Sequence, residues 1–204
     1  AGTLVGVLGY FWKSWRDIAT SLVKPNEDNH QYRKLFLLIV WATVPGAVTG
    51  LILKDFIEGV FRSPWVVASA LIGFSFIILF AEKVGEKLKD VHSLSWKKAV
   101  IVGSFQALAV IPGVSRSGAT ISAGLFLGLS RVEAAKFSFL LSAPIIFGTG
   151  LFKLPDMISE GIGAPFIAGV IVSAVSGYFA IKLLFKYLEK GSYMVFVGYR
   201  ILLG

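Results

Sequence analysis

Residues 99–129, AVIVGSFQALAVIPGVSRSGATISAGLFLGL, decide how the rest of the chain is interpreted. A polar turn, PGVSRSG, divides this stretch into apolar pieces of ~12 and ~10 residues, and neither can cross a bilayer core of about 30 Å. Backbone that is not helical survives at membrane depth only where protein or a water-filled cavity satisfies its polar groups. We therefore expect a re-entrant helix-loop-helix at about residues 99–129 that lines a polar cavity.

Apolar runs on both sides of this element predict membrane-spanning helices. Four runs approach the ~20 residues that cross a bilayer as a helix, namely residues 35–53, 64–81, 134–154 and 164–184. The runs at residues 1–12 and 193–204 are shorter, and we expect residues 13–34 and 82–98 to form polar loops. The expected fold class is all-α integral membrane, a polytopic helical bundle that forms one membrane domain over residues 1–204.

The first apolar run begins at Ala1, with neither an initiator Met nor a basic region ahead of it. Twelve helical residues cover only about 18 Å at 1.5 Å per residue. We therefore expect the chain to be truncated at its N-terminus.

Composition and charge agree with a membrane protein. Hydrophobic residues make up 55% of the chain and charged residues 16%, well below the roughly 25% charge of soluble domains. The net charge of +8 comes from basic residues in short loops between apolar runs, which membrane topology explains and nucleic-acid binding does not. Because the chain has no cysteine, disulfides and thiolate metal sites are excluded.

The distribution of basic residues predicts the topology. In alternate loops, fifteen of the 20 Lys and Arg residues fall on one side of the membrane and three on the other. Cytoplasmic loops are enriched in Lys and Arg, so the first side is expected to be cytoplasmic. The element at residues 99–129 must then leave and return to the cytoplasmic side, as either a re-entrant hairpin or two full spans would do. In both cases its PGVSRSG turn points toward the outer face.

Arg116 is the one charge between Lys98 and Arg131. Burying an arginine at membrane depth costs at least about 2.5 kcal/mol, and the nearest carboxylates in sequence, Asp90 and Glu133, lie outside the apolar element. An external anion is the simplest partner. The alternative is that Arg116 pairs with a distant carboxylate from another helix, while Ser and Thr side chains satisfy backbone groups freed by the proline.

The residues around Arg116 favour phosphate as this anion. A guanidinium can bind two phosphate oxygens, and a helix that starts near Gly118 would direct unpaired N–H groups at negative charge. Glycines allow the backbone to approach a ligand closely, and hydroxyls can donate to the remaining oxygens. These side chains and glycines are Gly113, Ser115, Ser117, Gly118 and Thr120.

The segment QALAVIPGVSRSGATIS, residues 106–122, resembles the second signature of the bacterial undecaprenyl-diphosphate phosphatase family of the bacitracin-resistance type. ATVPGAVTG, LSAPIIFGTG and the terminal GYRILLG also resemble that family, so the resemblance covers the whole chain. It implies hydrolysis of undecaprenyl diphosphate to undecaprenyl phosphate at the outer face of the bacterial plasma membrane. This reaction recycles the lipid carrier for peptidoglycan synthesis and confers bacitracin resistance.

The resemblance also implies roles for individual residues. Ser115, Arg116 and Thr120 would be catalytic, and the substrate-binding set would be Gln106, Gly113, Ser115, Arg116, Ser117, Gly118 and Thr120. The family uses a divalent cation, Mg²⁺ or Ca²⁺. Whether a serine, a histidine or water attacks phosphorus is left open, as is a homodimeric assembly.

One part of the family pattern is missing. The first signature, Glu-x-x-x-Glu followed by Pro-x-Ser-Ser-x-Gly-His, does not occur in this sequence. We expect it to precede Ala1 and to carry the metal ligands and acid–base groups, so that this fragment alone lacks full activity. The alternatives to an enzyme are a transporter or flippase of an anionic polyprenyl-phosphate lipid, which could use the same arginine and broken helices, and a structural membrane subunit.

Overall fold

The computed structural model describes residues 2–53, 63–155, 157 and 163–204, and in these residues the regular structure is entirely helical. Four helices are long and apolar enough to cross a membrane: α3 (His30–Ile52), α5 (Pro64–Val84), α8 (Arg131–Phe152) and α10 (Ala164–Leu188). They correspond to the four long runs predicted from the sequence. The chain is a multi-pass helical membrane protein, as predicted. Residues 54–62, between α3 and α5, lie outside the described residues.

The predicted loop at residues 13–34 was wrong, because most of it is helical. Helix α1 (Gly2–Tyr10) is followed by α2 (Trp12–Val23), and α3 begins at His30. Apolar residues at the helical spacing Trp15, Ile18 and Leu22 form one face of α2, with charged residues between them. The many charged residues of this segment led to the prediction of a loop, although its apolar residues follow a helical spacing.

The segment at residues 82–98 also differs from its predicted loop at both ends. Helix α5 continues to Val84, and α6 (Trp96–Ala107) begins before the segment ends. Between them lies a short 3₁₀ turn, η1 (Val91–Ser93). Ser95 starts α6, since its hydroxyl accepts a hydrogen bond from the N–H of Lys98 at 3.5 Å.

The predicted helix-loop-helix is confirmed. Helix α6 and the 3₁₀ turn η2 (Leu108–Val110) lead into an irregular turn, which is followed by α7 (Arg116–Phe126). Neither α6, with 12 residues, nor α7, with 11, is long enough to cross a bilayer. Helix α7 begins two residues earlier than predicted because Ser115 caps it, its Oγ accepting a hydrogen bond from the N–H of Gly118 at 3.1 Å.

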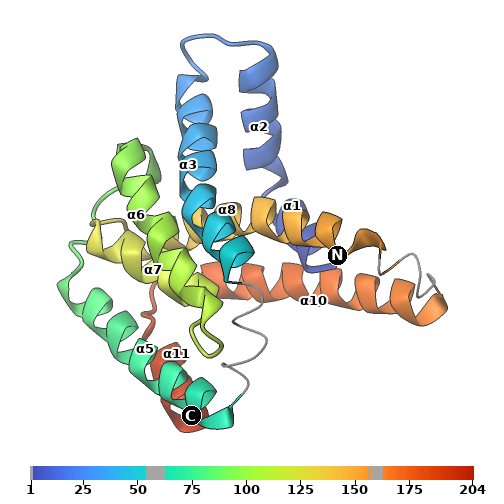
Figure 1. The fold of residues 1–204 in the computed structure, drawn as a ribbon. Coiled ribbons are helices and arrows are strands. Elements are labelled where there is room, and N and C mark those ends of the chain that lie inside the picture. The colour runs from blue at the N-terminus through green and yellow to red at the C-terminus, as the bar shows by residue number, and fades with distance from the viewer. Residues whose placement is uncertain (1, 54–62, 156, 158–162) are drawn as a thin grey trace.

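Helix α7 lies at the centre of the bundle and contacts α5, α6 and α8 (Figure 1). All residues from Ala119 to Leu125 are buried. Because these residues are small or apolar on every side of the helix, α7 can be enclosed by neighbours. The turn that precedes α7 is thereby fixed within the fold.

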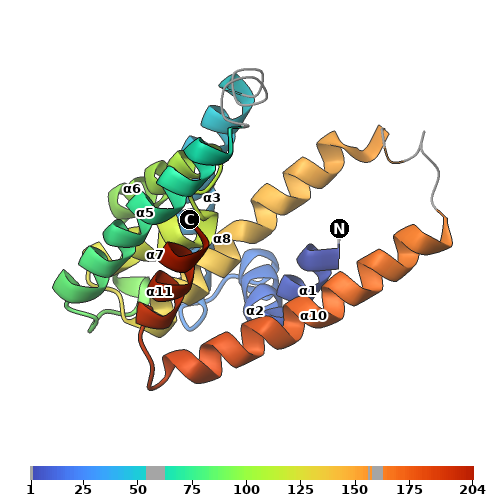
Figure 2. The same cartoon turned by 90° about the horizontal axis from the view of Figure 1, so that it is seen from below.

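Helix α1 packs closely on α10. A Cβ atom added at Gly6 would come within 2.7 Å of the carbonyl oxygen of Ala174, and one added at Gly2 would come closer still to Ser173 Oγ. Two glycines four residues apart form the small-residue face that lets membrane helices approach. Figure 2 shows α1 between α8 and α10, so one face of α1 is turned toward α8.

Candidate functional site

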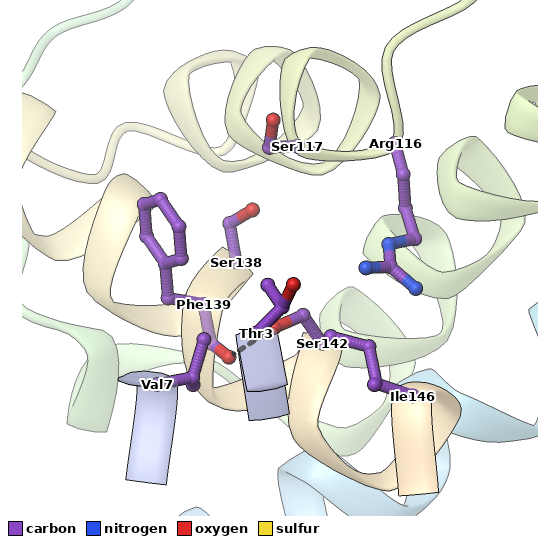
Figure 3. A pocket seen from close by; sticks show the side chains of 8 residues that line it. All are labelled: Thr3, Val7, Arg116, Ser117, Ser138, Phe139, Ser142 and Ile146. Atoms are coloured by element: carbon purple, nitrogen blue, oxygen red, sulfur yellow. Dashed lines mark hydrogen bonds between the residues drawn. The ribbon is translucent and has the colours of Figure 1, made fainter. Parts of the chain in front are cut away.

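A cavity of about 170 Å³ lies where the N-terminus of α7 meets α1 and the middle of α8 (Figure 3). Three elements that are distant in sequence form its wall. The lining residues are Thr3, Val7, Arg116, Ser117, Ser138, Phe139, Ser142 and Ile146. The wall thus combines one cation, four hydroxyls and an apolar border.

Arg116 is the first residue of α7 and is half-buried. Figure 3 shows its guanidinium extending into the cavity, toward α8 and α1. Within the described parts of the chain, this guanidinium has neither a hydrogen bond nor an ion pair. The predicted alternative of a distant carboxylate partner is therefore not found among the described residues, and Arg116 is available for an anion.

The N-terminus of α7 adds to the attraction for an anion. The first N–H groups of a helix have no acceptor within the helix. In α7, Ser115 Oγ accepts a hydrogen bond from only one of these groups, the N–H of Gly118. Ser115 Oγ also lies 3.2 Å from Ser117 Oγ. The positive end of the helix and the guanidinium therefore act on the same space.

Two serines of α8 and a threonine of α1 face this arginine. Figure 3 shows Thr3, Ser138 and Ser142 across the cavity from the guanidinium. The Ser142 hydroxyl donates to the carbonyl oxygen of Phe139 at 2.7 Å. None of these three residues was predicted from the sequence.

A signal for two of them was present in the sequence. Ser138 and Ser142 stand four residues apart in an apolar run, which places them on one face of α8, before Pro144. Thr3 gives no comparable signal. Its place beside the cavity depends on the packing of α1 against α8 and α10.

Thr120, predicted to contact phosphate, is buried behind the cavity wall with 2% of its surface exposed. Its hydroxyl lies 3.1 Å from the carbonyl oxygen of Arg116 and 2.6 Å from Ser138 Oγ. It therefore connects the first turn of α7 to α8. Direct contact between Thr120 and phosphate stays a prediction.

The remaining predicted residues face other helices. Gln106 is buried on α6, where a Cβ added at Gly46 of α3 would come within 2.6 Å of its Nε2. Gly118 faces Ile78 of α5. Gly113 has a φ of +96° and packs on α5. Of the predicted set, Arg116 and Ser117 line the cavity, and Ser115 lies beside them.

The residues at the cavity do not fit a divalent cation by themselves. Mg²⁺ and Ca²⁺ prefer carboxylate and carbonyl oxygens, whereas the lining side chains are hydroxyls, apolar groups and a guanidinium. In the part of the chain that the structure describes, no group of three or more His, Cys, Asp or Glu residues gathers in a way that could hold a metal. No step of the reaction is therefore assigned to a metal through these residues.

Comparison with known proteins gives close relatives over the full chain. An undecaprenyl-diphosphatase of Elusimicrobium minutum is 48% identical over 203 residues, which is 99% of this chain and 77% of the relative. Proteins of the same name from Moorella thermoacetica and Mycolicibacterium smegmatis are 43% and 45% identical, and each is matched over 77% of its length. The family described as bacitracin resistance protein BacA matches residues 1–204.

The cavity and these matches agree with each other. The segment that resembles the family signature is the one that forms the Arg116 turn, and the matched region includes α1 and α8, which complete the cavity wall. The chain therefore belongs to the BacA family of bacitracin resistance proteins.

Proposed function

We propose that the protein hydrolyses undecaprenyl diphosphate to undecaprenyl phosphate and inorganic phosphate, and that the Arg116 cavity binds the diphosphate. The relatives that carry the name undecaprenyl-diphosphatase are 43–48% identical over nearly the whole chain. The reaction consumes one water, breaks the bond between the terminal phosphorus and the bridging oxygen, and leaves that oxygen on the lipid phosphate. It would return the lipid carrier to peptidoglycan synthesis and so give bacitracin resistance.

One observation carries the assignment of the cavity. The Arg116 guanidinium is half-buried, has no partner among the described residues, and points into a space that hydroxyls border. An unpaired charge in apolar surroundings is costly unless a ligand of opposite charge offsets it. A diphosphate supplies that charge, and its oxygens match the planar guanidinium.

The side chains at the cavity can contribute positioning and charge stabilisation. Phosphoryl transfer depends chiefly on holding the phosphate and stabilising negative charge on its oxygens. Arg116 and the first N–H groups of α7 would bind the equatorial oxygens, and Ser117 would donate from the same turn. Ser138 and Ser142 would border the diphosphate from α8.

The orientation of the site and its cation are part of the same proposal. The excess of Lys and Arg in alternate loops supports an active site that opens to the outer face of the bacterial plasma membrane. We also propose dependence on Mg²⁺ or Ca²⁺, with ligands from outside the described residues. Chelation with EDTA should then abolish activity, and either ion should restore it. A homodimer stays a prediction.

The test of the function is release of phosphate from a long-chain polyprenyl diphosphate by the purified full-length protein in detergent. We expect inorganic phosphate and the lipid monophosphate in equal amounts. Arg116→Lys should keep part of the rate that Arg116→Ala loses, because lysine keeps the charge but lacks the planar fork. Full activity in Arg116→Ala would contradict the assignment of the cavity.

A second assay separates hydrolysis from transport. The protein is placed in vesicles with a labelled polyprenyl monophosphate, and movement of the label between leaflets is measured. Movement of the lipid without any phosphate release from the diphosphate would favour the flippase alternative. Phosphate release without movement is the expected result.

A further inference from the structure

A second arginine, Arg200, contacts the turn without lining the cavity. Arg200 lies in α11 (Met194–Leu203), which packs against α5. Its Nη2 donates a hydrogen bond to the carbonyl oxygen of Gly113 at 2.9 Å and lies 3.3 Å from the carbonyl oxygen of Leu71. Its Nε donates to Ser75 Oγ at 3.1 Å. One guanidinium thus joins α11, α5 and the turn.

These partners are all neutral. Arg200 lies in a short apolar helix. Within the residues that the structure describes, no carboxylate forms an ion pair with it. Ser75 is fully buried, and its own proton is used on the carbonyl oxygen of Leu71 at 2.7 Å, so its oxygen is oriented to accept from Arg200. A charge placed among neutral acceptors in apolar surroundings is costly, which indicates that the contact has a specific role.

The carbonyl that Arg200 holds belongs to the most constrained residue of the turn. Gly113 has a φ of +96°, a conformation that other residues rarely adopt. A Cβ at this position would come within 2.3 Å of the carbonyl oxygen of Val67. The Gly113 peptide is therefore fixed by α5 on one side and by the Arg200 hydrogen bond at its carbonyl.

Gly113 precedes Arg116 by three residues and the cap residue Ser115 by two. The direction of the Gly113 peptide consequently sets where α7 begins and where the Arg116 side chain leaves the backbone. Small displacements matter at such a place, because a shift of about 1 Å in a group that binds a transition state can lower a rate about 100-fold.

We propose that Arg200 is a positioning residue that holds the anion-binding turn in place without touching the substrate. The proposal rests on the function proposed for the Arg116 cavity. It differs from a purely structural role, in which Arg200 would only attach α11 to α5. A structural role affects the stability of the protein, whereas a positioning role also affects how the folded protein binds and processes phosphate.

The test compares Arg200→Gln and Arg200→Lys with Tyr193→Phe in the full-length protein. Tyr193 lies next to the other end of α11, where its hydroxyl donates to the carbonyl oxygen of Arg131 at 2.9 Å, so it controls for a weakened attachment of the helix. Three quantities are measured: the midpoint of thermal unfolding, kcat and KM for a polyprenyl diphosphate, and the inhibition constant of inorganic phosphate.

We expect Arg200→Gln to lower kcat/KM about 10- to 100-fold, as displaced binding groups do, and to raise the inhibition constant of phosphate. Arg200→Lys should recover part of both values, since lysine can reach one carbonyl but not three acceptors together. Tyr193→Phe should leave both values unchanged. Ser75→Ala, which removes one acceptor of Arg200, should change both values in the same direction by a smaller factor.

A lower unfolding midpoint in Arg200→Gln with unchanged kcat/KM and phosphate inhibition would overturn the proposal. If that variant does not fold, wild-type constants in both Arg200→Lys and Ser75→Ala would overturn it equally. Failure of the proposed function has a different signature, because the wild-type protein would then release no phosphate. In that case a thermal shift by inorganic phosphate, compared between wild type and Arg200→Gln, still tests the positioning role.

Discussion

Helices α7 and α8 each begin with an arginine, and the surroundings of these two arginines are opposite in character. Arg116 is the first residue of α7, directly after the turn, and has no partner among the described residues. Arg131 stands after α7, in a region that we call the base, formed by residues 82–90, 128–131 and 193. In the base, Nε of Arg131 donates a hydrogen bond to Oε1 of the buried Glu82 carboxylate at 2.6 Å. Nη2 of Arg131 forms an ion pair with the same oxygen. Lys87 lies 3.8 Å from that oxygen.

The base is also tied together through its backbone. The N–H groups of Leu88 and Lys89 donate to the carbonyl oxygen of Gly128 at 3.2 and 2.9 Å, and the N–H of Ser130 donates to Lys89 at 3.0 Å. The hydrogen bond from the Tyr193 hydroxyl to the carbonyl oxygen of Arg131 connects the start of α11 to the base. Every one of these contacts is internal to the fold.

This difference separates a structural charge from a functional one. Both arginines are the first residues of helices, α7 and α8, and both are charged in a largely apolar chain. At the base the charge is neutralised by Glu82 within the protein, whereas at the turn it is left for a partner from outside. Loss of each arginine should therefore affect a different property of the protein.

The largest effect is expected at the turn. Arg116→Ala should lower kcat/KM by about 10³-fold, in the range found for arginines that stabilise a transferring phosphoryl group. The midpoint of thermal unfolding should stay unchanged or rise, because an unpaired charge is removed from the interior. A large fall in the unfolding midpoint would show that Arg116 has an internal partner and would break the comparison with Arg131.

The next effect is expected at the base. Glu82→Ala removes the carboxylate and leaves Arg131 unpaired, which for a buried pair costs about 3 kcal/mol. The unfolding midpoint should fall strongly, while kcat/KM of the folded fraction should remain near wild type. Glu86→Ala is the matched control. Glu86 pairs with Lys89 at 3.0 Å on the surface, and such a pair contributes less than about 1 kcal/mol.

The sequence predicted the parts of this comparison that depend on local order along the chain. The long apolar runs gave the spans, and the polar turn between two short apolar pieces gave the helix-loop-helix. The isolated charge of Arg116 marked the site, because a lone arginine in an apolar element needs a partner. These signals lie within one segment and require no knowledge of its neighbours.

The sequence could not predict which distant side chains meet at the cavity. Ser138, Ser142 and Thr3 line the same cavity as Arg116 only because α8 packs against α7 and α1 packs against α8. Thr120 lies one helical turn after Arg116, but its hydroxyl bonds back to the Arg116 carbonyl, as threonine does in helices. Gln106 was predicted to contact the substrate from the family resemblance; it lies against Gly46 of α3, and its contact with substrate stays a prediction.

Loss of the Thr120 hydroxyl should have a smaller effect on kcat/KM, and its size tests whether Thr120 binds phosphate, as Arg116 is proposed to do, or supports the fold, as Arg131 does. Thr120→Val keeps the shape of the side chain and removes its contact with Ser138, which should cost about 1 kcal/mol of stability. Because Thr120 connects the first turn of α7 to α8, kcat/KM should fall about 3- to 10-fold, less than for loss of a group that binds the transition state.

A double-mutant cycle with Ser138→Ala measures this contact. If the two hydroxyls act through each other, the double variant should lose less stability than the sum of the single variants, and the difference, the coupling energy, should be at least about 0.5 kcal/mol. A loss of kcat/KM in Thr120→Val as large as that in Arg116→Ala would place its hydroxyl on the phosphate itself, as the sequence predicted.

The smallest effect is expected at Tyr193. Tyr193→Phe removes one buried hydrogen bond of the base, to Arg131, and should lower stability by about 1 kcal/mol without changing kcat/KM. Burial, and next the negative charge of Glu82, raise the pKa of Tyr193 above its ordinary value. The folded protein therefore keeps this phenol protonated where the unfolded chain ionises it.

The sign of the resulting pH dependence follows from this shift. Below the unfolded pKa of about 10, both states hold the proton and the contribution of Tyr193 is fully present. As pH rises above that value, only the unfolded state gains from ionisation, so stability falls until the folded pKa is passed. The unfolding midpoint of the wild type should thus decrease more steeply than that of Tyr193→Phe above pH 10. Equal pH dependence of the unfolding midpoint in the two proteins would mean that solvent reaches the phenol of Tyr193, so that the base does not bury it.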